Sequence, residues 1–127
     1  MISTPWLVLL FAGVGFLGFG LAYSLRPVQM AAFTDLALAT ATARADFAAT
    51  YGGFQIGFGL FLLACAHHRG WLEPGLWAAT AVLLGLASVR GLGILWSRGQ
   101  VRGTIWFGLG LELVGLALNV WALAQVS

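Results

Sequence analysis

Charge is scarce in this sequence, and lysine is missing altogether. Charged residues make up 8% of the 127 residues and hydrophobic residues 61%, whereas an ordinary soluble domain has roughly 25% charged residues. Such a chain has too few polar residues to cover a soluble surface, but a bilayer accepts the apolar outer faces of helices. The net charge of +2 is too small, and the six arginines too dispersed, to indicate a nucleic-acid partner.

Cysteine is equally scarce, because Cys65 is the only one, and a single cysteine excludes an internal disulfide. Cys65 lies close in sequence to His67 and His68. Adjacent histidines face different directions on a helix, and no acidic residue or second cysteine nearby completes a metal site. We interpret these histidines as interfacial residues that flank a membrane span, and we expect neither a metal nor a cofactor.

Catalytic motifs are also lacking. Gly13, Gly15 and Gly18 spell G-x-G-x-x-G, but no strand precedes them, so the motif does not indicate dinucleotide binding. Glycines in this apolar run, including Gly20, indicate instead a thin helix surface for close packing. Because the sequence supplies no nucleophile, metal set or haem arrangement, an enzyme with Glu112 or Tyr51 as proton donor ranks last among the functions considered.

Long apolar runs are abundant. Four of them can each cross a hydrocarbon core of roughly 30 Å, and they cover about residues 6–25, 45–66, 75–96 and 104–124. The first run is longer than the apolar region of a signal peptide and has no basic residue before it, so we expect a retained helix. The sequence therefore predicts an all-α membrane protein, with one domain over residues 1–127 that forms a four-transmembrane-helix bundle.

The longest connection, residues 26–43, joins the first two spans. Met30, Phe33 and Leu36 are spaced three residues apart, which favours a short helix at the membrane interface, and an irregular loop fits the weak pattern equally well. Thr42 is expected to cap the second spanning helix.

Arginines are distributed unequally between the loops. The second loop holds one, whereas the first and third loops hold four between them, Arg26, Arg44, Arg98 and Arg102. The positive-inside rule then places the first and third loops in the cytoplasm. For a bacterial inner-membrane protein with four spans, both termini are expected to be periplasmic.

A polar stripe enters the second span. Arg44, Tyr51 and Gln55 are spaced by seven and four residues, which predicts that all three lie on one face of a helix. Gly52 and Gly53 leave the backbone bare beside Tyr51, and Gly53 with Gly57 forms a G-x-x-x-G pattern that favours close approach of another helix.

Two opposite charges lie inside the third and fourth spans. Arg90 is seven residues before Ser97 and Glu112 is eight after Thr104, so both are expected about 10 to 12 Å deep. Asn119 follows on the same face as Glu112, with Gly108 and Gly115. A structural Arg90–Glu112 clamp between the two helices explains these charges as well as a binding role does. The polar Tyr51 and Gln55 at a similar depth favour a polar pocket.

The block from Arg44 to Gly53, RADFAATYGG, is followed by a glycine-rich apolar run, by an arginine in the third span and by a glutamate in the fourth. With these features the chain resembles a family of small bacterial four-span membrane proteins of unknown function, and more distantly the DoxX-like group, some members of which are linked to quinone-dependent sulfur oxidation. The resemblance implies a four-helix membrane fold and supplies no activity.

Two classes of function remain. In the first, a cytoplasm-facing intramembrane pocket binds a lipid, quinone or other small amphiphile through a set of ligand-binding residues, namely Arg44, Tyr51, Gly52, Gly53, Gln55, Arg90, Glu112 and Asn119. In the second, the protein is a structural or accessory subunit of a homo-oligomer or larger membrane complex, and its polar cluster serves helix packing. Membrane lipid is the expected environment in both.

Overall fold

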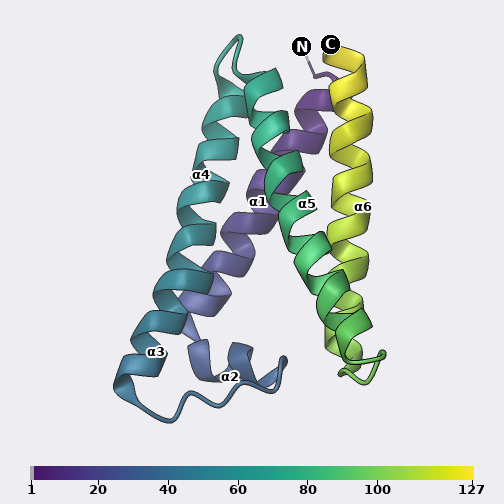
Figure 1. Cartoon of the computed structure of the whole chain (residues 1–127). Coiled ribbons are helices and arrows are strands. Elements are labelled where there is room, and N and C mark those ends of the chain that lie inside the picture. Colours follow the sequence, from purple (N-terminus) through teal and green to yellow (C-terminus); the bar gives the residue numbers. More distant parts are fainter. Residues whose placement is uncertain (1) are drawn as a thin grey trace.

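The computed structural model describes residues 2–127 and contains four long apolar helical spans that run up and down (Figure 1). The first is α1 (Thr4–Leu25), and the second is continuous through α3 (Ala41–Phe47), the π-helical η1 (Ala48–Gly53) and α4 (Phe54–His67). The third and fourth are α5 (Leu72–Trp96) and α6 (Gly103–Val126). Each is long and apolar enough to cross a membrane, which confirms the predicted all-α four-helix bundle.

The connection after α1 is part helix and part loop. Its helix, α2 (Pro27–Ala32), covers only the first third of the segment, and an irregular stretch follows that passes through a left-handed residue, Asp35, with φ of 59°. The predicted cap Thr42 is wrong, because Thr42 lies inside the first turn of α3. Thr40 caps this helix instead, since its hydroxyl accepts a hydrogen bond of 3.0 Å from the Ala43 N–H.

Helix α1 packs against η1 and α4 through reciprocal glycine contacts. A Cβ added at Gly20 would lie 2.9 Å from the Gly52 carbonyl oxygen, and one added at Gly52 would lie 3.1 Å from the Gly20 carbonyl oxygen. Gly13 and Gly59 repeat this arrangement seven residues away on each helix. A Cβ added at Gly13 would lie 3.2 Å from the Gly59 carbonyl oxygen, and one added at Gly59 would lie 2.8 Å from the Gly13 carbonyl oxygen. The two backbones therefore approach as closely as a missing side chain permits, which gives extensive van der Waals contact where lipid supplies no hydrophobic drive.

The buried core lies near the end of the bundle that carries both termini. Leu9 of α1, Leu62 and Cys65 of α4, and Leu76 of α5 are almost fully buried there, together with Ala122 of α6. Towards the opposite end, the α1–α4 pair and the α5–α6 pair separate, as Figure 1 shows. The bundle thus consists of two helix pairs that share a core at one end only.

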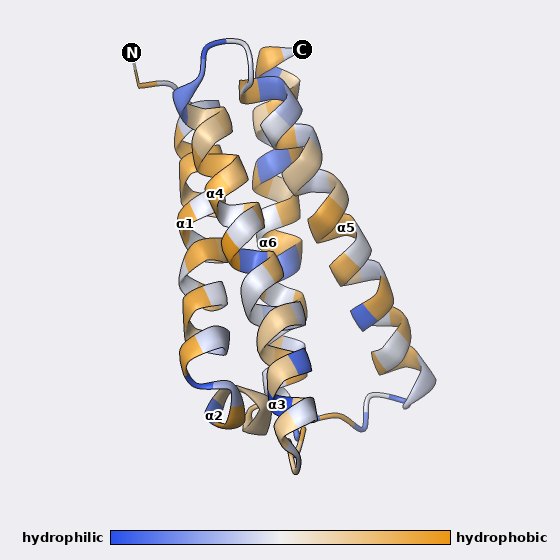
Figure 2. Cartoon of the chain, turned by 90° about the vertical axis from the view of Figure 1, so that its left-hand side faces the viewer, coloured by the Kyte–Doolittle hydropathy of each residue, from blue (hydrophilic) through white to orange (hydrophobic). Residues whose placement is uncertain are grey.

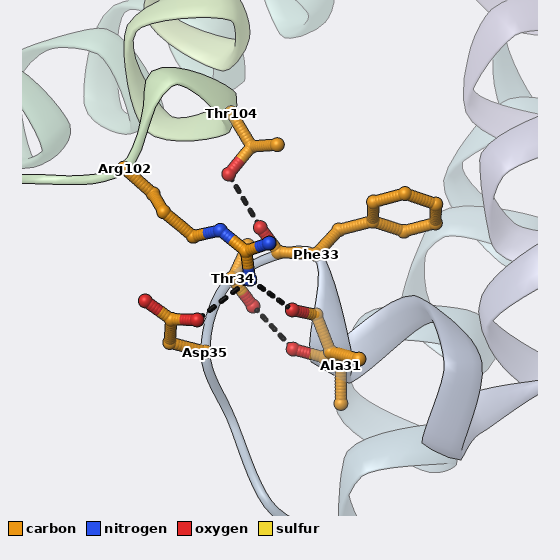
Figure 3. Close-up of polar contacts among 7 residues, drawn as sticks. Ala31, Phe33, Thr34, Asp35, Arg102 and Thr104 are labelled. Atoms are coloured by element: carbon orange, nitrogen blue, oxygen red, sulfur yellow. Dashed lines mark hydrogen bonds and ion pairs between the residues drawn. The ribbon is translucent and has the colours of Figure 1, made fainter.

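At the end where the pairs separate, one set of polar contacts joins them (Figure 3). The Nη1 of Arg102, just before α6, donates to the Ala32 carbonyl at 2.8 Å and to the Asp35 carboxylate at 2.6 Å. The Thr104 hydroxyl donates to the Phe33 carbonyl. This loop bridge fixes the connection after α2 to the start of α6.

Candidate functional site

The ion pair expected between the third and fourth spans is present. The Nε of Arg90 donates to both carboxylate oxygens of Glu112, at 2.9 and 3.0 Å, and Nη2 lies 2.7 Å from Oε1. The Glu112 side chain is 11% exposed and that of Arg90 30% exposed. Figure 2 shows that the long helices are mostly apolar ribbons, with a hydrophilic position in the lower half of α5. Two-point contact to one carboxylate satisfies Glu112 and leaves the Nη1 edge of Arg90 for other partners.

Gly108 gives the guanidinium room. A Cβ at Gly108 would lie 3.5 Å from Nε and Cζ of Arg90 and 3.6 Å from Nη1. An alanine at this position of α6 would therefore be in van der Waals contact with the guanidinium. Among the described residues, Nη1 of Arg90 has no hydrogen-bond partner, so one donor group of this partly buried cation stays free.

An aromatic cluster lies on the other helix pair at the end where the pairs separate. Tyr23 of α1, Phe47 of α3 and Tyr51 of η1 pack together, with ring centroids 4.6 Å apart for Phe47 and Tyr51 and 5.9 Å apart for the two tyrosines. Both phenol groups lie within electrostatic range of the Arg90 charge, and neither is hydrogen-bonded to Arg90 among the described residues. Tyr23, Tyr51 and Arg90, called here the tyrosine–arginine cluster, thus come from three helical segments that are distant in sequence.

Tyr23 was missed from the sequence. A tyrosine two residues before the end of a span is typical of the aromatic belt at the membrane surface, and no motif marks it as anything else. Its position could have indicated a role, because Tyr23 lies almost one helical turn before Arg26, within the first span. Tyr51 likewise lies within the neighbouring span.

Arg44 and Gln55 do not join this cluster. Nη1 of Arg44 donates at 3.4 Å to the Leu38 carbonyl in the preceding loop, and the Gln55 side-chain amide donates at 2.8 Å to the Tyr51 carbonyl of its own helix. The prediction of one continuous α-helical face is wrong, because η1 lies between Arg44 and Gln55 and its wider π-helical turn changes the angular spacing of residues.

The glycines have different roles from those predicted. Gly52 is buried against Ser24 and Gly20 of α1, so it contributes to helix packing. A Cβ at Gly53 or Gly57 meets no atom within 4 Å, so the predicted G-x-x-x-G contact is wrong. The close contacts come instead from Gly52 and Gly59, whose spacing of seven residues matches that of Gly13 and Gly20.

Asn119 is buried in the α5–α6 interface, as its position on the face of Glu112 predicts. Its Nδ2 donates at 2.8 Å to the Gly115 carbonyl one turn earlier. Gly115 packs against Leu83 of α5, where an added Cβ would lie 3.3 Å from a Leu83 methyl group. Asn119 therefore belongs to the same helix pair as Arg90 and Glu112, without contacting their ion pair through a hydrogen bond.

Two hollows on the surface lie away from the predicted residues. One, of about 230 Å³, is lined by Phe61, Cys65, Trp71 and Pro74, and the other, of about 360 Å³, lies along α1 and is lined by Val14, Gly15, Gly18, Phe19, Ala22 and Met30. Both linings are almost entirely apolar, which is suited to lipid chains and gives no polar recognition.

These features define a class: an integral membrane protein with four apolar helical spans, in which an arginine–glutamate pair joins α5 and α6 and an aromatic cluster lies on the opposite helix pair. Residues 6–123 match the model of one family, and the chain belongs to it: Domain of unknown function (DUF4345). A search of curated proteins and of solved structures found no match. The predicted membership of a small family of unknown function is thereby confirmed, and the DoxX-like resemblance stays a prediction.

Proposed function

We propose that this protein binds a membrane amphiphile whose polar group accepts hydrogen bonds, such as a lipid or a quinone, at the tyrosine–arginine cluster. The proposal depends chiefly on one observation, the free hydrogen-bond donors of this cluster. Among residues 2–127 neither the Tyr23 nor the Tyr51 hydroxyl has a hydrogen-bond partner, and Nη1 of Arg90 is also unpaired.

Unpaired donors favour a ligand at this cluster. A polar group that is partly removed from water without a partner costs free energy, and Tyr51 and Arg90 are only partly exposed. An acceptor group of a ligand, for example a quinone carbonyl or a lipid ester or phosphate oxygen, would relieve that cost. Because the free groups are two phenols and a cation, the site favours an acceptor over a donor.

Access from the membrane supports the same proposal. The Tyr51 side chain is among the exposed ones, at 46%, and Arg90 retains 30% exposure of its side chain. The two helix pairs separate at this end (Figure 1), and the surrounding helix surfaces are apolar. An amphiphile can therefore bring its polar group to the cluster while its chain stays in lipid.

Paired tyrosine variants test the proposal. The full chain is extracted gently, and its phospholipid and quinone content per mole of protein is measured by native mass spectrometry and by analysis of organic extracts. Tyr23→Phe and Tyr51→Phe should each weaken retention about fivefold, the equivalent of about 1 kcal/mol for one hydrogen bond, and the double variant should lose more. Gln55→Met is the matched control, because the Gln55 amide already bonds to its own helix.

Two results would contradict the proposal. One is wild-type protein that carries no small molecule after gentle extraction. The other is retention that is equal in the double tyrosine variant and in the wild type. Either result would favour the accessory-subunit interpretation, in which the cluster serves only the packing of the helices.

A further inference from the structure

The α5–α6 interface has a regular layered arrangement. On α5 the residues at the interface are spaced alternately by three and four, as Thr80, Leu83, Ala87 and Arg90, and on α6 the same alternation runs through Gly108, Glu112, Gly115 and Asn119. Two contacts fix the antiparallel register, since Leu83 packs on Gly115 and Arg90 packs on Gly108. With this register Thr80 lies at the level of Asn119.

Thr80 and Asn119 are both deeply buried, with 9% and 1% exposure. Within the described part of the chain, Thr80 Oγ1 and Asn119 Oδ1 are the two buried side-chain polar atoms that have no hydrogen-bond partner. The amide of Asn119 is oriented by its Nδ2 bond to the Gly115 carbonyl, which leaves the oxygen end unsatisfied. An unpaired buried polar atom carries its full desolvation penalty, and native proteins leave few such atoms unsatisfied.

We infer that Thr80 and Asn119 bind one buried water molecule between α5 and α6. The amide oxygen only accepts hydrogen bonds, whereas a hydroxyl both donates and accepts. A water molecule can donate one hydrogen bond to Asn119 Oδ1 and form a second hydrogen bond with Thr80 Oγ1, so that both atoms are satisfied together. Two partners meet the minimum for a stable buried water.

The chemistry of the layer selects water over other ligands. Both groups are neutral, so a bare cation would lose its hydration without a compensating charge, and the nearest carboxylate of this interface, Glu112, is already paired with Arg90. Buried leucines close the layer on both sides, because Leu83 covers Gly115 and Leu76 is fully buried in the shared core, so a ligand larger than water has no room there.

This water site is separate from the tyrosine–arginine cluster. Asn119 is seven residues from Glu112 along α6, a distance of about 10 Å, and it lies on the side of the shared core. The inference therefore does not depend on amphiphile binding at the cluster.

Solution NMR of the full chain in lipid nanodiscs tests the site. A long-lived bound water should give a cross peak between water and the Asn119 side-chain amide protons. Thr80→Val preserves the shape of the side chain and removes the hydroxyl, so the peak should disappear, whereas Thr80→Ser retains a hydroxyl and should keep it. Thr50→Val, which changes an exposed threonine, is the matched control and should leave the peak unchanged.

Two outcomes would overturn the inference. The wild type could lack the water peak, or the Thr80 hydroxyl proton could show a direct contact with Asn119 and no water signal. A water peak that persists in Thr80→Val would equally assign the water to other partners. The retained fold of each variant is checked by its backbone amide spectrum.

Discussion

The two helix pairs of this bundle are held together by different means. Where α1 meets η1 and α4, the closest contacts are made by backbone atoms, since Gly13, Gly20, Gly52 and Gly59 face one another across the interface. Where α5 meets α6, the interface contains an ion pair and buried polar groups. Lipid chains are as apolar as leucine, so neither pair is driven together by the hydrophobic effect, and each needs a specific attraction.

The difference indicates where chemistry is available. Glycine contacts depend on shape alone and carry no charge, so the α1–α4 pair contributes to the cluster only through its tyrosines. The α5–α6 pair places charge inside the membrane, where ionisable residues are expensive and often functional. The tyrosine–arginine cluster arises where these two interfaces face each other, at the end where the pairs separate.

The largest effect is expected from a side chain at Gly59. A Cβ there would lie 2.6 Å from the Leu17 backbone nitrogen and 2.8 Å from the Gly13 carbonyl oxygen, and backbone atoms cannot move aside as a flexible side chain can. Gly59→Leu should destabilise the protein by about 3 kcal/mol or more. Equilibrium unfolding in mixed detergent measures this change.

The matched control is Gly57→Leu, two residues away on the same helix, where an added Cβ meets no atom within 4 Å. This variant should be neutral or slightly stabilising, because leucine has a better helix propensity than glycine by up to about 1 kcal/mol. Equal losses of stability at the two positions would show that close backbone packing does not hold this pair together.

The second effect tests the polar interface. Arg90→Gln removes the partner of Glu112, and an uncompensated charge in a membrane helix costs about 2.5 to 3.5 kcal/mol. Because Arg90 is partly exposed, we expect a loss of about 2 kcal/mol in the same unfolding experiment. The double variant Arg90→Gln with Glu112→Gln should recover part of it. Strictly additive single effects would show that the two residues do not interact.

The spans could be predicted from the sequence because the evidence for each span lies within its own residues. Twenty apolar residues in a row identify a membrane helix whatever surrounds them, and the Arg90–Glu112 pair followed from two charges at equal depth. The glycine contacts could not be predicted with the same success. Eighteen glycines offer many patterns, and only the rotation of each helix decides that Gly52 and Gly59 pack while Gly53 and Gly57 do not.

The candidate site was predicted only in part, because it also depends on how each helix is turned about its axis. The interpretation of Arg44, Tyr51 and Gln55 as one face assumed a uniform α-helix, and η1 interrupts that regularity. Apolar and small residues such as Ala48, Ala49 and Gly53 fit an α-helix and a π-helix alike, so no residue marks the change of turn. Tyr23 lies on a different span, and its approach to Arg90 depends on how the two helix pairs are placed.

The smallest effect on stability is expected at the loop bridge, the contact between the pairs at their separated end. Arg102→Gln removes the ion pair with Asp35, but the two side chains are 50% and 70% exposed, so the loss should be below about 1 kcal/mol and should shrink in high salt.

The effect of Arg102→Gln on geometry should be clearer, because residues 31–35 and 102–104 lose a fixed contact (Figure 3). Spin labels at positions 29 and 100, in a Cys65→Ala background, should give a broader distance distribution than in the protein with Arg102. Arg98→Gln removes the same charge from an arginine with no ion pair among the described residues, and it should leave the distribution unchanged. An equal width in Arg102→Gln would mean that the shared core alone determines how far the two helix pairs separate.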